Sequence, residues 1–160
     1  PLLGDMNKLP FEHCFFDLIW AEGCIYIMGL EQGLIQWRPF LKHHGFIAFT
    51  EVTWLRDDPP EELRLFWKRA YPAIGSIQKN KNIIRRTGYT LQHHFVLPES
   101  DWWEQYYGPI EKKLPLLKSA YVNDAESLAV LEIEEKEIDL YRRYSDYYGY
   151  VFYIAQKSET

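Results

Sequence analysis

Three carboxylates stand where an acidic side chain can bind a small molecule. Asp5 and Glu22 each follow a short apolar segment, and Glu51 lies near the end of another. Ligands of open α/β sheets bind beyond the carboxyl ends of the strands, so we expect Asp5 and Glu22 at a ligand site. A carboxylate there can accept hydrogen bonds, orient a substrate or act as a base. Spacing alone favours a loop-turning role for Asp5. For Glu22, spacing alone leaves two roles open: a functional acid, or an acid at the end of a strand that is only hydrated by water.

Two pairs of adjacent histidines raise the question of a metal site. They are His43-His44 and His93-His94. Successive side chains of a strand point to opposite faces of a sheet, so adjacent histidines are poor ligands for one ion. We therefore predict no metal site.

The composition limits the class of protein. The 160 residues suffice for a single domain, 1–160, with a sizeable core, and the 17% aromatic share suits a core with a cleft or an interaction surface. The net charge of −5 argues against nucleic acid as a partner, because phosphate binding needs a basic surface. No apolar run is long enough to span a membrane. Cys14 and Cys24 make no disulfide framework; we expect small core residues in a cytoplasmic protein.

A strand–helix–strand unit should position the acids. The spacing predicts a buried strand over 15–20, a helix over 29–42 that Gly45 ends, and a second strand over 45–52. Two strands joined in this way are parallel and their crossover is right-handed.

The remaining chain is rich in helices and ends on strands. We predict a helix that Asp58 caps, a helix over 74–86 and a strand over 89–97. A helical insert then covers about 98–148. It starts with a short helix that Gly108 and Pro109 end and continues with a long helix that begins at Asp124 and that Gly149 ends. A final strand over 150–155 follows the insert. The insert carries an aromatic cluster, which is a lid, a subunit contact or, the favoured alternative, core packing (Trp102, Trp103, Tyr106 and Tyr107). It also carries an acidic run that we interpret as a solvated helix face (Glu132, Glu134, Glu135 and Glu137).

Two stretches of the sequence carry a family resemblance. The first reads DMNKLPF at 5–11 and FDLIWAEG at 16–23; the second reads WRPFLK at 37–42 and GFIAFTE at 45–51. They resemble class I S-adenosylmethionine-dependent methyltransferases of the small-molecule type. In that family an acid followed by x-LPF comes after the third strand, the fourth strand begins with FD, and an LKPGG turn leads into the fifth. LKHHG at 41–45 is a looser version of that turn.

The resemblance implies a fold, a cofactor and site residues. The fold is α/β, an incomplete Rossmann-like methyltransferase fold that has parallel strands, a C-terminal antiparallel strand pair and the helical insert. S-adenosylmethionine is the implied cofactor. Asp5 would accept from the adenine amine and Met6 would lie against the ring, with Ala21 and Glu22 near the transferred methyl group. The pocket for a small-molecule methyl acceptor would be lined by Tyr26, Glu51 and Trp54. The sulfonium is already activated, so alignment suffices and no nucleophile is required of the protein.

The sequence also departs from the family. It contains no Gly-x-Gly, whereas the family binds the cofactor at an acidic-Gly-x-Gly-x-Gly loop in its first half. We therefore expect the chain to be an incomplete, C-terminal portion of such an enzyme. The alternative is a non-catalytic remnant or oligomerising module. Without the preceding strands, the strand at 15–20 has an unpaired apolar edge, which predicts a homo-oligomer or a partner that covers it.

Overall fold

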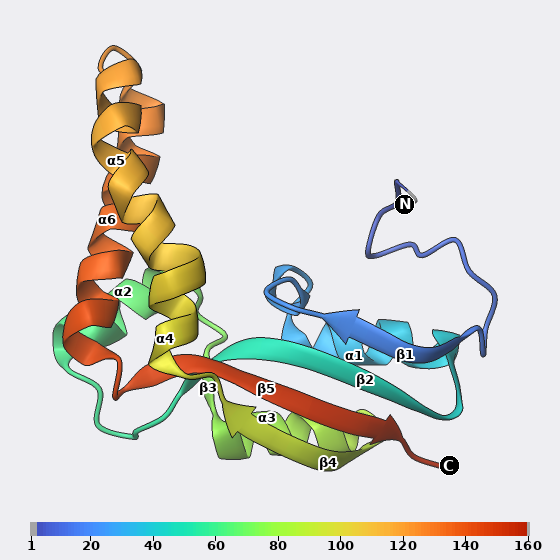
Figure 1. Cartoon of the computed structure of the whole chain (residues 1–160). Helices are drawn as coiled ribbons and strands as arrows, with labels where there is room; N and C mark the ends of the chain where they lie inside the picture. Colours follow the sequence, from blue (N-terminus) through green and yellow to red (C-terminus); the bar gives the residue numbers. More distant parts are fainter. Residues whose placement is uncertain (1–2, 160) are drawn as a thin grey trace.

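A mixed sheet organises the chain in the computed structural model, which describes residues 3–159 (Figure 1). The strands are β1 (Phe16–Ala21), β2 (Leu41–Trp54), β3 (Gly75–Ser76), β4 (Tyr89–Val96) and β5 (Tyr148–Lys157). Their order is β1-β2-β5-β4, and the short β3 also pairs with β2. β1 and β3 run parallel to β2, whereas β5 is antiparallel to both β2 and β4. The predicted α/β fold with parallel strands and a C-terminal antiparallel pair is confirmed.

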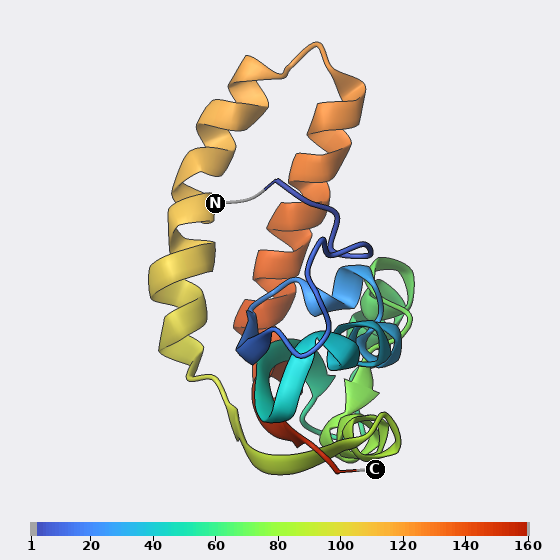
Figure 2. The ribbon, with the colours of Figure 1, turned by 90° about the vertical axis from the view of Figure 1, so that its right-hand side faces the viewer.

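Helices cover one face of the sheet and extend beyond one of its ends. α1 (Leu30–Trp37) and α3 (Ile77–Arg86) pack on the same face (Figure 2). α2 (Glu61–Ala70) lies near the end of β2. The predicted insert consists of α4 (Glu99–Trp102), a π-helical turn η3 (Trp103–Tyr107), α5 (Gly108–Ala120) and α6 (Ala125–Tyr144). α5 and α6 form a hairpin that projects away from the sheet (Figure 1). α6 starts at Asp124 as predicted, because that side chain accepts from the amides of Glu126 and Ser127.

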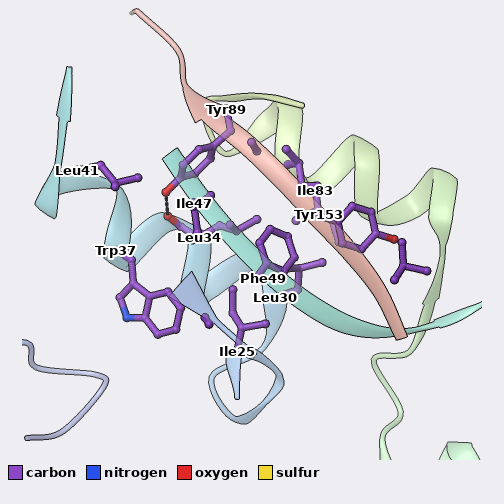
Figure 3. Close-up of a cluster of buried hydrophobic side chains, with 14 residues drawn as sticks. Ile25, Leu30, Leu34, Trp37, Leu41, Ile47, Phe49, Ile83, Tyr89 and Tyr153 are labelled. Atoms are coloured by element: carbon purple, nitrogen blue, oxygen red, sulfur yellow. Dashed lines mark hydrogen bonds between the residues drawn. The ribbon is translucent and has the colours of Figure 1, made fainter. Parts of the chain in front are cut away.

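The main core lies between the sheet and the pair α1 and α3 (Figure 3). Leu34 of α1 is fully buried, and its carbonyl accepts a hydrogen bond from the Tyr89 hydroxyl at 3.0 Å. On the sheet, Phe49 stacks on Tyr153 with ring centroids 5.3 Å apart. α1 therefore packs on β2 in the core and is also hydrogen-bonded to β4, which is the edge strand on the other side of β5.

The opposite face of the sheet is open. Leu18, Trp20, Phe46 and Phe95 are exposed there, although all four are large apolar residues. Leu18 is paired with Phe46 in register, and Phe95 stacks on Phe152 of β5. The prediction of a buried strand at 15–20 is therefore wrong in its burial. β1 is an edge strand: Ile19 and Ala21 pack into the core, whereas Trp20 on the other face stays exposed although its ring meets Phe152 at 5.2 Å.

Several element ends differ from the prediction. The helix expected to reach residue 42 ends at Trp37, because Pro39 lies in the 3-10 turn η2 (Arg38–Phe40) and Leu41 already pairs with Phe16. Asp58 does not cap α2; it forms an ion pair with Arg56 at 2.9 Å.

Two predicted stops and one core assignment are also wrong. Gly108 and Pro109 do not end a helix: the π-helical turn η3 runs directly into α5, and Pro109 lies in the first turn of α5. Gly149 lies within β5. Cys14 is exposed and has φ of 56°, so it is not a core residue.

Candidate functional site

A cleft of about 520 Å³ opens where β1 and β2 end and β5 begins. Glu22, Gly23 and Tyr26 contribute from the segment after β1, and Thr50 and Tyr150 contribute from the sheet. The helical insert supplies the remaining wall with Asp101, Trp102, Gln105 and Tyr106, together with the preceding Leu97. The cleft therefore lies at the carboxyl ends of the parallel strands, where open α/β sheets bind their ligands.

A tight turn after β1 places Glu22 at this cleft. Ala21 is buried at the end of the strand, and the Gly23 amide donates to Thr50 Oγ1 at 2.8 Å. Gly23 has φ of 57°, a left-handed conformation that glycine adopts without steric cost. The turn thus leaves the Glu22 side chain exposed on the lining of the cleft.

A smaller chamber of about 270 Å³ adjoins the cleft. The two share Tyr26, Trp102, Tyr106 and Tyr150. The chamber adds Trp67 and Tyr71 from α2 and the residue after it, and the carboxylates of Glu134 and Glu137 from α6. Its walls are thus mostly aromatic, and its only charged lining residues among those described are two acids.

Burial raises the pKa of both chamber carboxyls. For Glu137, the Tyr107 hydroxyl donates at 2.7 Å and opposes that increase, whereas neighbouring Glu134 adds to it. Glu134 Oε1 is inaccessible to solvent and accepts no hydrogen bond from the described residues. Other acids of α6 are paired: Glu135 with Lys118 and Asp139 with Arg143.

Glu51 lies behind the chamber rather than on its surface. It is 2% exposed, and Tyr71 donates its hydroxyl hydrogen to Glu51 Oε1 at 2.6 Å. Burial raises the pKa of Glu51 to about 7, although the Tyr71 hydrogen bond and the charge of Lys79 oppose the increase. The Tyr71 ring meets Tyr26 edge-on at 5.8 Å. Glu51 is therefore connected to the cleft through two tyrosines.

The other residues predicted from sequence lie elsewhere. The exposed Asp5 accepts from the amide and the side chain of Asn7, which lowers its pKa. The Met6 carbonyl accepts from Trp37 Nε1 at 3.0 Å, and its side chain packs against the core near α1. Trp54 lines a separate hollow with Arg56 and Asp57. Of the predicted residues, the structure brings together Glu22 and Tyr26 on one cleft, above the buried Ala21, with Glu51 behind.

Sequence reasoning missed Glu134 and Glu137. They were assigned to a solvated face, but only Glu132 and Glu135 of that acidic run are exposed. The available signal was helical spacing: Glu134, Glu137 and Tyr141 follow one another at i, i+3 and i+7, and Tyr141 is buried.

Two structural searches gave negative results. Within residues 3–159, no group of three or more His, Cys, Asp or Glu side chains is arranged to hold a metal ion. In the same part of the chain, no helix has the length and apolarity needed to cross a membrane.

Comparisons of the fold with known structures give a consistent result. A S-adenosylmethionine-dependent methyltransferase from Geobacter sulfurreducens, in complex with S-adenosylhomocysteine, superimposes with a TM-score of 0.74 at 17% identity, over 98% of this chain and 63% of that chain. A candidate sarcosine dimethylglycine methyltransferase from Galdieria sulphuraria gives 0.72 at 16% identity, over 97% and 58%. Haemonchus contortus phosphoethanolamine N-methyltransferase 2, with S-adenosylmethionine, gives 0.67 at 17% identity, over 97% and 36%.

This chain spans less than two thirds of the length of each of these structures. No family model and no curated protein matches the sequence.

Proposed function

Because the chain has the fold of a class I S-adenosylmethionine-dependent methyltransferase over the aligned part, we propose that it belongs to an enzyme that methylates a small molecule with this cofactor. The observation that carries the proposal is the cleft at the ends of β1 and β2, walled by aromatic residues of the insert and by Glu22. Methyl transfer to a small acceptor needs such a partly apolar pocket next to the donor, because alignment provides much of the rate.

The donor site proposed here uses residues at the strand ends. Glu22 has an exposed carboxylate and no ion-pair partner among residues 3–159, so it fits the ammonium group of the cofactor. Asp5 uses only Oδ1 to bind Asn7, which leaves Oδ2 to accept from an adenine amine. Met6, beside the adenine ring, and Ala21, next to the transferred methyl group, complete the proposed set of residues that bind S-adenosylmethionine. We propose that a glycine-rich segment outside these residues supplies the rest.

The acceptor side is proposed to consist of the predicted Tyr26, Glu51 and Trp54. Tyr26 lines the cleft directly. Glu51 acts on it through Tyr71. Trp54 lines the separate hollow and is proposed to act indirectly, through its edge-on contact with Tyr148 at 6.3 Å. S-adenosylmethionine, when bound, supplies the activated methyl group, and these residues orient the acceptor and exclude water.

Binding of S-adenosylhomocysteine tests the proposal in the natural polypeptide that contains these residues. At about 100 times its dissociation constant the ligand should add about 2.7 kcal/mol to the free energy of unfolding, measured by thermal denaturation. Glu22→Ala should weaken binding about tenfold, because it removes a charge-assisted contact. Glu12→Ala, an exposed acid outside the cleft, is the matched control. A folded protein that does not bind the ligand contradicts the proposal.

We also propose that a second copy of the chain covers the open face of the sheet. Leu18, Trp20, Phe46 and Phe95 form an apolar surface beside an unpaired edge strand, and such surfaces promote association.

Sedimentation velocity of the 160-residue chain should therefore show self-association. The double substitution Trp20→Lys and Phe46→Lys should shift the chain toward monomer, since it places two charges in the contact. Leu116→Lys, on the exposed surface of α5, should leave association unchanged. A wild-type chain that stays monomeric, with β1 protected from hydrogen exchange, would argue against this contact.

A further inference from the structure

The chamber beside the cleft combines aromatic walls with unpaired carboxylates. Tyr26, Tyr71, Trp102 and Tyr106 are among its lining residues, and Glu134 and Glu137 are its only charged ones among those described. The face of an aromatic ring carries partial negative charge and attracts cations, most strongly where water is excluded. Rings and carboxylates in one small chamber therefore favour the same kind of ligand.

The two carboxylates lack a positive partner in the protein. Neither has a lysine, arginine or histidine nitrogen within ion-pair distance among residues 3–159, although their neighbours Glu135 and Asp139 on α6 do. Glu134 Oε1 is also buried without a hydrogen bond. Burial disfavours the charged form of such a carboxyl group, and a cation bound in the chamber would supply the partner that the described residues do not.

We infer that the chamber binds the cationic nitrogen of the methyl acceptor, a small amine or ammonium compound. This inference rests on the proposed methyltransferase function, because the chamber opens into the cleft through Tyr26, Trp102, Tyr106 and Tyr150. The volume of about 270 Å³ suits a compact head group. The carboxylates hold the positive charge and the rings exclude water from it.

The test compares a cation with its uncharged isostere. Choline and 3,3-dimethylbutan-1-ol have the same shape and the same hydroxyl, and differ in the charge of the central atom. Titration of the natural polypeptide, followed by tryptophan fluorescence and by calorimetry, should give at least about tenfold tighter binding of choline. Equal affinity for the two probes would overturn the inference without any variant.

Two variants locate the charge preference. Glu134→Gln combined with Glu137→Gln should remove most of it, weakening choline about tenfold and leaving the isostere unchanged. Glu135→Gln, on the same helix but paired with Lys118, should bind both probes as the wild type does. A double variant that is folded by circular dichroism and keeps the preference for choline overturns the assignment to these carboxylates.

S-adenosylhomocysteine is titrated into the same samples. If it binds and the charge preference is absent, the inference fails and the proposed function stands. If the charge preference is present and S-adenosylhomocysteine does not bind, the proposed function fails and the cation chamber stands alone.

Discussion

Replacing Trp102 with alanine should lower the free energy of unfolding by about 3–5 kcal/mol, measured by urea denaturation. Trp102 is 5% exposed, and its ring stacks on Tyr141 at 4.6 Å, Tyr150 at 4.7 Å and Tyr107 at 5.1 Å. These tyrosines come from α6, β5 and η3. The substitution therefore opens a cavity where the helical insert meets the sheet.

The control for this experiment is the neighbouring Tyr106. Its side chain is 48% exposed, so Tyr106→Ala should cost no more than about 1 kcal/mol. A loss for Trp102→Ala as small as this would mean that the insert does not pack on the sheet as described.

The stability of the protein should fall as the pH rises from 4.5 to about 7, and Glu51 should account for much of this decrease. The pKa of Glu51 is raised from 4.5 to about 7 in the folded state. The folded protein therefore retains a proton that the unfolded chain releases, and raising the pH through this window favours unfolding. One pKa unit corresponds to about 1.4 kcal/mol, so the full effect is about 3 kcal/mol.

Glu51→Gln isolates this contribution. Glutamine does not titrate but can still accept the Tyr71 hydrogen bond. Across the window, the unfolding free energy of the variant should rise by about 3 kcal/mol relative to that of the wild type. Glu134 and Glu137 also have raised pKa values, but they act equally in both proteins. Denaturant titrations at a series of pH values measure the difference, and parallel curves for the two proteins would refute it. The exposed Glu22→Gln should follow the wild type.

Local patterns predicted most of the fold. The short apolar runs at β1, β2 and β5 form strands, as their length and composition indicate. Asp124 caps α6, as its residue type and position indicate. Glycine and proline were less reliable as signals for the end of a helix. Pro109 and Gly149 were expected to end helices, yet one lies in the first turn of α5 and the other in β5. Only the pairing of β5 with β2, which is set by distant residues, decides the role of Gly149.

The site was harder to predict than the fold. Glu22 follows a strand and lies at the cleft. Its position was predictable because the end of a strand can be recognised from the residues around it. Helical spacing places Glu134 and Glu137 on the same face of α6 as the buried Tyr141, but it does not specify that this face meets α2 and η3 at the chamber. The resemblance to methyltransferases predicted the parallel strands and the C-terminal antiparallel pair, but not that β5 lies between β2 and β4.

The position of β5 between β2 and β4 affects the order of events during synthesis. β2 pairs with β5 from Phe46↔Gln156 to Trp54↔Tyr148, and β4 pairs with β5 but not with β2. Until residues 148–157 leave the ribosome, β2 lacks its antiparallel neighbour and β4 has no strand to join. Pairings so distant in sequence form slowly, because a long loop must close first. In the cell, the nascent chain therefore exposes the unpaired strand β4 and one edge of β2, and needs protection from aggregation until β5 is inserted between them.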